Sequence, residues 1–171
     1  MELKDYIRVQ EDFPRKGISF KDVSPLLENA EAFRFTIDEM KRIADEWQPD
    51  VIVGPESRGF LFGAPLAIVM KKGFLMARKA GKLPGEALSI SYDLEYGSAT
   101  LEIPAFAIKK GTRVLIVDDL LATGGTVKAL ETLLENAGAE IVGFITLIEL
   151  TDLKGRDILK APFESLIKYP H

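Results

Sequence analysis

An apolar segment that leads directly into two adjacent carboxylates limits the possible folds of this chain more than any other feature. The segment is RVLIV, residues 113–117, and its β-branched residues predict a strand that is buried on both faces. Asp118 and Asp119 follow at the carboxyl end of this strand, where open α/β sheets bind their ligands. Because side chains alternate along a strand, the two carboxylates are expected to point to opposite faces.

The turn after the two carboxylates has the properties of an anion site. It reads ATGGT, residues 122–126, and its small side chains leave backbone N–H groups open where a helix is expected to begin. The hydroxyls of Thr123 and Thr126 add hydrogen-bond donors. The turn lacks the Gly-Lys-Ser/Thr ending of a Walker loop and the glycine spacing of a dinucleotide fingerprint.

A sugar phosphate fits this pattern, with its phosphate on the turn and its ribose hydroxyls on the aspartates. The residues expected to bind it are Asp118, Asp119, Ala122, Thr123, Gly124, Gly125 and Thr126. The run 114–126 resembles the ribose-phosphate signature of the phosphoribosyltransferases that use phosphoribosyl pyrophosphate. The alternative interpretation is an ordinary strand–turn–helix corner.

Strands and helices are expected to alternate along most of the chain. Helices are predicted from Asn29, as the capping residue, to about Trp47, over 60–71, and from the glycine turn to Gly138, and strands at 51–53, 74–77 and 141–150, with two antiparallel arms at 88–93 and 99–103. This order predicts a single α/β domain over residues 1–171, with a mainly parallel central sheet flanked by helices and the arms forming a flap. Residues 13–25 are expected to be irregular, and no site is expected after residue 150.

Composition excludes several classes of chemistry. The chain has no cysteine, which excludes disulfides and cysteine-bound zinc, and its sole histidine is the last residue, His171, which argues against a histidine-based triad. Any metal is therefore expected to be a hard cation on oxygen ligands, with Mg²⁺ the first choice. A formal net charge of -4 favours neither nucleic acid nor an anionic membrane as a partner. No signal peptide or membrane-spanning run is recognisable, so a cytoplasmic location is expected.

Two further segments carry groups suited to pyrophosphate. After the strand at 51–53, Ser57 offers a hydroxyl and Arg58 a planar fork of donors. Farther along, Arg78, Lys79 and Lys82 place three cations in five residues that glycines and a proline follow, which suits capture of a polyanion. In isolation, the first segment is also read as a surface arginine near a helix start, and the second as a solvated charge run.

The segment SYDLEYG, residues 91–97, contains the candidate proton carrier. Glycosyl transfer to a purine nitrogen requires a proton to leave the base, and without a usable histidine a carboxyl is the natural acceptor. Glu95 is favoured over Asp93 because it lies nearer the tip of the expected flap. The alternative interpretation is an exposed loop acid.

Taken together, the blocks 13–25, 54–63, 78–97 and 114–126 are similar to those of the adenine phosphoribosyltransferases, and the resemblance extends over residues 7–150. It implies the type I phosphoribosyltransferase fold with a flexible flap, which would include Tyr96, and an N-terminal hood segment. Within that fold, Phe20 would stack on adenine, the backbones of Ser19 and Lys21 would read its edge, and Leu120 would pack on its other face. Lys21 departs from the arginine that is usual at this position of the family.

The same resemblance implies the activity and the remaining roles. Adenine and phosphoribosyl pyrophosphate would give AMP and pyrophosphate, with Glu95 as the acid/base. The pyrophosphate ligands would be Ser57, Arg58, Arg78, Lys79 and Lys82. Mg²⁺ would interact with Asp118 and Asp119 indirectly, through ribose hydroxyls or water, and the chain would form a homodimer. Two alternatives remain, namely the same chemistry on hypoxanthine, guanine or xanthine, and a regulator that senses phosphoribosyl pyrophosphate, for which no basic helix-turn-helix stretch is readable.

Overall fold

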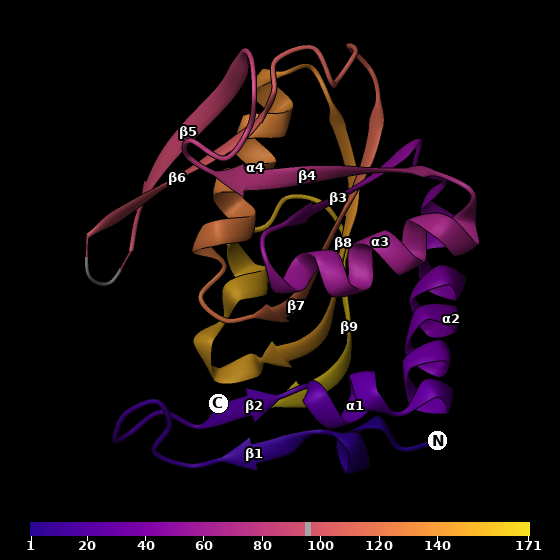
Figure 1. The fold of residues 1–171 in the computed structure, drawn as a ribbon, viewed down its shortest axis with the longest axis vertical. Helices are drawn as coiled ribbons and strands as arrows, with labels where there is room; N and C mark the ends of the chain where they lie inside the picture. Colours follow the sequence, from indigo (N-terminus) through magenta and orange to yellow (C-terminus); the bar gives the residue numbers. More distant parts are fainter. Residues whose placement is uncertain (95–96) are drawn as a thin grey trace.

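The computed structural model of the protein describes residues 1–94 and 97–171, and its centre is a seven-stranded sheet (Figure 1). The strands lie in the order β5-β6-β4-β3-β7-β8-β9. Neighbouring strands from β4 to β9 in this order are parallel, whereas β5 and β6 form an antiparallel hairpin beside β4. The mainly parallel sheet that the sequence predicts is confirmed. Its strands are β3 (Val51–Pro55), β4 (Gly73–Lys79), β5 (Ala87–Asp93), β6 (Ser98–Pro104), β7 (Arg113–Leu121), β8 (Glu140–Leu150) and β9 (Phe163–Tyr169).

Helices cover both faces of this sheet. The side chains of α2 (Ala30–Trp47) and α3 (Arg58–Met70) pack into one hydrophobic cluster, and those of α4 (Gly125–Asn136) pack into a second. Strand β7 contributes to both, because Leu115 and Val117 face the first cluster and Val114 and Ile116 the second. This alternation explains why the sequence of β7 is apolar throughout.

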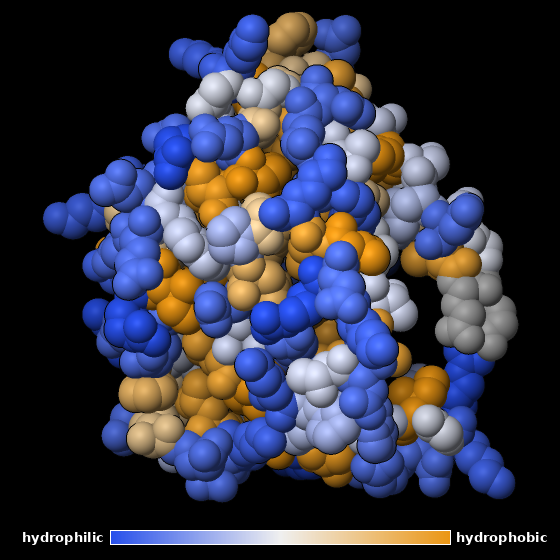
Figure 2. Space-filling view, turned by 180° about the vertical axis from the view of Figure 1, so that it is seen from behind, coloured by the Kyte–Doolittle hydropathy of each residue, from blue (hydrophilic) through white to orange (hydrophobic). Residues whose placement is uncertain are grey.

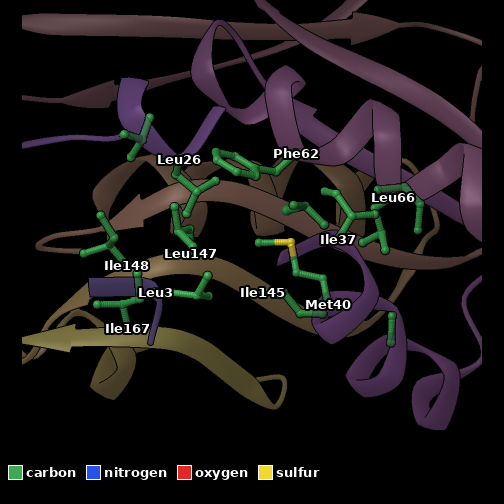
Figure 3. Close-up of a cluster of buried hydrophobic side chains, with 14 of the residues drawn as sticks. Leu3, Leu26, Ile37, Met40, Phe62, Leu66, Ile145, Leu147, Ile148 and Ile167 are labelled. Carbon is green, nitrogen blue, oxygen red and sulfur yellow. The ribbon is translucent and has the colours of Figure 1, made fainter. Parts of the chain in front are cut away.

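The first cluster joins segments that are far apart in the sequence. Figure 3 shows Leu3 and Leu26 from the N-terminal region, Met40 and Phe62 from α2 and α3, and Ile145 from β8 among the side chains that converge there. All of these side chains except Leu3 are fully buried. The N-terminal region is therefore attached to the sheet by apolar packing.

Local signals account for the placement of α2. The Asn29 side chain accepts a hydrogen bond from the backbone N–H of Ala32 at 2.9 Å, as the predicted cap requires. At the other end of α2, the Trp47 ring lies directly over Gly143 of β8, so that a Cβ at residue 143 would overlap the ring. The glycine allows the end of α2 to approach the sheet closely, which no local pattern predicts.

The two ends of the chain are more ordered than the sequence indicates. Residues 13–25 were expected to be irregular, but they include β2 (Phe20–Asp22), which pairs with β1 (Arg8–Gln10), and the start of α1 (Ser24–Glu28). A 3-10 turn, η1 (Leu3–Tyr6), precedes them. Beyond residue 150, the turns η2 (Thr151–Leu153) and η3 (Gly155–Ile158) lead into β9, a strand that was not predicted. Strand β2 pairs with β1, and β9 pairs with β8 across the turns η2 and η3.

The hairpin of β5 and β6 forms one edge of the sheet and projects beyond the other strands, as the predicted flap would (Figure 1). In the space-filling view, a gap is visible beside this arm near the right edge, and hydrophilic and hydrophobic side chains both occur on that face (Figure 2). The expected acid/base Glu95 and the flap residue Tyr96 lie outside the described residues. In the part of the chain that is described, none of the helices has the length and apolar character needed to cross a bilayer.

Candidate active site

A pocket of about 270 Å³ opens at the carboxyl ends of β3 and β7. Its walls are residues 55–58, which follow β3, and residues 118–127, which run from the end of β7 into α4. Because β3 and β7 are parallel neighbours, the two segments open at the same edge of the sheet. Of the residues singled out in the sequence, the pocket brings together Ser57, Arg58, Asp118, Asp119, Leu120, Ala122, Thr123, Gly124, Gly125 and Thr126.

The glycine turn is shaped for an anion at the start of α4. Gly124 caps the helix with φ of 91°, a conformation that strongly favours glycine. Within the described chain, no side chain accepts a hydrogen bond from the first turn of α4, so its N–H groups are available to a ligand. Gly125 lies in the helix, and nothing stands within 4 Å of where its Cβ would be, which leaves room beside the backbone.

The two aspartates differ in their surroundings. Asp119 is 6% exposed, and its Oδ2 lies 2.9 Å from Nε of Arg58. Asp118 accepts a hydrogen bond from the backbone N–H of Asp119 at 2.8 Å. Burial and then the neighbouring charge of Asp119 raise the pKa of Asp118 well above its usual range. A second negative charge in this corner is therefore costly without a cationic or hydrogen-bonding ligand.

Both aspartates lie against the start of α3, although simple strand alternation predicts that their side chains point to opposite faces of the sheet. Asp119 contacts Arg58, and Oδ1 of Asp118 would lie 3.1 Å from a Cβ at Gly59. That Cβ would also lie 2.9 Å from Cδ of Pro55. Gly59 therefore allows α3 to approach the end of β7, a role for which the sequence offers only the presence of a glycine.

Glu56 links the pocket to the basic segment, and the sequence gives it no role. Its Oε1 accepts hydrogen bonds from the backbone N–H of Lys79 at 2.8 Å and from Nε of Arg78 at 3.1 Å. These contacts, the backbone bond to Lys79 first, lower the pKa of Glu56. Lys82 is exposed and does not belong to the pocket lining among the described residues. Sequence reasoning gives Glu56 no role because this carboxylate contacts cationic residues of the chain and not the expected ligand.

The residues expected to bind the base lie on β2 and next to it. The Phe20 ring faces the guanidinium of Arg58 at 5.7 Å and meets the edge of Phe13 at 5.2 Å. Arg58 thus lies between this aromatic pair and Asp119 of the pocket. Leu120 belongs to the pocket lining itself.

Lys21 directs its side chain away from a role in stacking. Its Nζ donates to Oγ of Ser19 at 2.6 Å and lies 5.0 Å from the centre of the Tyr169 ring on β9. Burial lowers the pKa of this lysine. The side chain of Lys21 therefore helps to hold β2 against β9.

The flap is in contact with the glycine turn through its β5 arm. The hydroxyl oxygens of Tyr92 and Thr126 lie 3.4 Å apart. Tyr92 is two residues before Leu94, the last described residue of this arm, so the contact is made near the outer end of the hairpin. The sequence places both residues in separate segments and does not indicate that they meet.

The oxygen donors in the pocket suit a cation for which water and substrate supply most of the ligands. Among the described residues, no group of three or more His, Cys, Asp or Glu side chains could hold a metal ion. Asp118 and Asp119 offer hard carboxylate oxygens, and Mg²⁺ is commonly bound by one or two carboxylates together with substrate phosphates and water. The residues present thus fit Mg²⁺ as a companion of a phosphorylated ligand.

Comparison with known proteins agrees with this geometry. The phosphoribosyl transferase domain family matches residues 22–161. The adenine phosphoribosyltransferases of Clostridium perfringens (strain 13 / Type A) and Clostridium kluyveri (strain NBRC 12016) are 54% and 55% identical over 170 residues, which are 99% of this chain and 99% of each relative. The chain belongs to this family, among the adenine phosphoribosyltransferases.

Solved structures of adenine phosphoribosyltransferases have the same fold. The structure from Thermoanaerobacter pseudethanolicus is 49% identical, covers 98% of both chains and superposes with a TM-score of 0.94. The Saccharomyces cerevisiae enzyme, complexed with adenine and an imino-altritol bisphosphate, is 43% identical over 96% of both chains, with a TM-score of 0.93. The sequence-based assignment to this family is confirmed.

Replacing Glu56 by Gln should lower the free energy of unfolding at neutral pH but not in acid. The depressed pKa of Glu56 means that its ionised form stabilises the fold, fully at pH values above its ordinary pKa of 4.5, and that this contribution is lost as the pH falls through the lowered pKa. At pH 7, the free energy of unfolding should therefore fall by about 1 kcal/mol, and the difference from the wild type should disappear in acid. Urea denaturation across this pH range measures it.

The exposed Glu46 provides the matched control, because Glu46→Gln removes the same charge away from the pocket. Its stability should differ from that of the wild type by less than about 0.5 kcal/mol at every pH. Parallel pH profiles for the wild type and Glu56→Gln would contradict the role assigned to Glu56.

Proposed function

We propose that this protein transfers the phosphoribosyl group of phosphoribosyl pyrophosphate to adenine, giving AMP and pyrophosphate. The observation that carries this proposal is the pocket in which paired aspartates meet an uncapped glycine turn, in a chain about 55% identical to adenine phosphoribosyltransferases over nearly its whole length. The whole chain would act as one phosphoribosyltransferase domain.

The sugar phosphate is positioned by the segment after β7. Its 5′-phosphate binds to the N–H groups and hydroxyls of the turn 122–126, at the positive end of α4. Its ribose hydroxyls donate to the carboxylates of Asp118 and Asp119. Hydrogen bonds from these hydroxyls stabilise the ionised form of Asp118, whose pKa is raised in the free protein.

The pyrophosphate is held by the basic groups on the other side of the pocket. Arg58 leaves Asp119 to bind phosphate oxygens, and Ser57 donates its hydroxyl from the neighbouring position. Arg78 and Lys79 start from the side of Glu56, and Lys82 joins them from the exposed loop. Mg²⁺, held indirectly by Asp118 and Asp119, supplies charge neutralisation of the pyrophosphate leaving group when it is bound.

Adenine binds between the N-terminal hood, which contains β1 and β2, and the end of β7. Phe20 stacks on one face of the ring, once Arg58 has moved from it, and Leu120 packs on the other. The backbones of Ser19 and Lys21 read the edge of the base, while the side chain of Lys21 stays with Tyr169. A contact to a backbone is insensitive to the exchange of arginine for lysine at this position.

Bond formation requires the proton of the attacking nitrogen to be removed. Glu95 takes this proton as the base nitrogen bonds to the anomeric carbon and the bond to pyrophosphate breaks. The transition state has oxocarbenium character, as in glycoside hydrolysis. Closure of the β5–β6 flap keeps water from reaching the activated sugar.

Adenine should be the preferred base. A purine amino group donates where an oxopurine accepts, so a site built for one leaves buried polar groups unpaired with the other. We expect kcat/KM for adenine to exceed that for hypoxanthine or guanine by a factor on the order of 10⁴. Pyrophosphate release with each base measures this, and equal or faster turnover of an oxopurine would assign the protein to another purine.

Glu95→Gln should lower the rate of a single turnover by about 10²- to 10⁴-fold, because it removes the proton acceptor while keeping the shape of the side chain. The affinity for AMP should change by no more than about threefold. Single-turnover measurement is necessary because product release can limit steady-state rates. Asp93→Asn is the matched control and should keep the wild-type rate, whereas a normal rate in Glu95→Gln would move the proton role to another group.

The protein is also proposed to act as a homodimer. Helix α3 has Arg58 as its only charged residue, yet Leu61 and Ile68 are 40% and 77% exposed. An apolar helix is normally covered, and a second copy of the chain would cover this face. Ile68→Glu should convert a sedimenting dimer of 18.9-kDa chains into monomers, whereas Leu153→Glu, at an exposed site after β8, should not. A wild-type monomer in sedimentation equilibrium would contradict the proposal.

A further inference from the structure

The segment after β8 forms a close contact with the glycine turn, although the sequence assigns it no site. A Cβ at Gly155 of η3 would overlap the carbonyl oxygen of Ala122 and lie 3.1 Å from Cγ of Leu121. In return, a Cβ at Gly124 would lie 2.9 Å from the carbonyl oxygen of Gly155. The two backbones thus touch directly, and each contact requires a glycine.

This contact is made from outside the pocket. The lining of the pocket includes the turn 122–126 but not η3. Cδ1 of Ile158, also in η3, would lie 3.1 Å from a Cβ at Gly124. The turn therefore has the ligand space on one side and the backbone of η3 on another.

An ion pair between the exposed Arg156 and the buried Glu149 holds η3 in place. Arg156 donates from Nε to Oε2 of Glu149 at 2.8 Å and from Nη2 to Oε1 at 2.7 Å. Oγ of Ser165 on β9 donates to the same carboxylate at 2.9 Å. Glu149 is 3% exposed and is the partner of Leu121 in the ladder between β7 and β8. The ion pair thus fixes η3 to the sheet at the level where β7 ends and the turn begins.

A second carboxylate connects the same segment to α4. Oε2 of Glu131 lies 3.3 Å from the backbone N–H of Lys160, which donates to it, and Oε1 accepts from Nζ of Lys128 at 2.8 Å. Glu131 is 1% exposed. Residues 155–160 are therefore attached both to the strand that precedes the glycine turn and to the helix that follows it.

We propose that Gly155 and Arg156 are positioning residues for the 5′-phosphate, which act by holding the turn 122–126 in its anion-binding conformation. This proposal rests on the proposed function, since it names the group that the turn receives. The N–H groups of a phosphate cradle must be oriented before the ligand arrives if binding is to be tight. A support that only stabilised the fold would affect ligands with and without a phosphate equally.

The test compares AMP with adenosine, which lacks the phosphate, by isothermal titration. Gly155→Ala should displace the turn and weaken AMP binding by about tenfold or more, while adenosine binding stays within about twofold of the wild type. Gly73→Ala is the matched control, because its Cβ would lie 4.0 Å from the nearest atom, Cγ2 of Val51, far from the turn. It should leave both affinities unchanged.

Arg156 provides a second pair of variants, which is decisive if Gly155→Ala does not fold. Arg156→Ala should raise the KM for phosphoribosyl pyrophosphate several-fold more than the KM for adenine, and Arg156→Lys should recover part of the loss because it keeps the charge without the planar fork. Equal losses for AMP and adenosine, or wild-type AMP affinity in folded variants, would overturn the proposal. Failure of the proposed function is distinguished by a wild-type protein that forms no AMP.

Discussion

The burial of β7 between two hydrophobic clusters is the constraint on which the rest of the structure depends. Leu115 and Val117 pack under α2 and α3, while Val114 and Ile116 pack under α4. A strand that is apolar on both faces can only lie in the interior of a sheet. Its carboxyl end therefore opens between two layers of helices, and whatever polar residues follow are delivered to the edge where ligands bind.

At that edge, charges are paired in a way that a ligand must rearrange. Arg58 neutralises Asp119, Arg78 neutralises Glu56, and Asp118 has its pKa raised by burial and by its neighbour. The same Arg58 also faces the ring of Phe20. A phosphorylated sugar and a planar base would replace these internal contacts with contacts of their own. The burial of Asp118 beside Asp119 costs stability in the free protein, which is common where function requires buried polar groups.

Much of the site could be predicted from the sequence because its residues lie next to one another. The aspartates and the turn 122–126 follow β7 directly, and Ser57 and Arg58 follow β3, so strand order alone brings them together. The hood and the C-terminal segment were less accessible to prediction. Strand β2 has only 3 residues and pairs with β1, and β9 pairs with β8 across two 3-10 turns, so neither is marked by the alternation of strands and helices.

The sequence by itself determined that the chain has an α/β fold and to which family the protein belongs, and it predicts a sugar phosphate at the end of β7. Only the tertiary structure decided that Glu56 pairs with Arg78, that Gly59 admits α3 beside Asp118, and that Gly155 touches the glycine turn. The physical reason is that propensity and periodicity act over neighbouring residues. Close backbone approaches and ion pairs depend on the separation of atoms in space, which only the packing of the whole chain fixes.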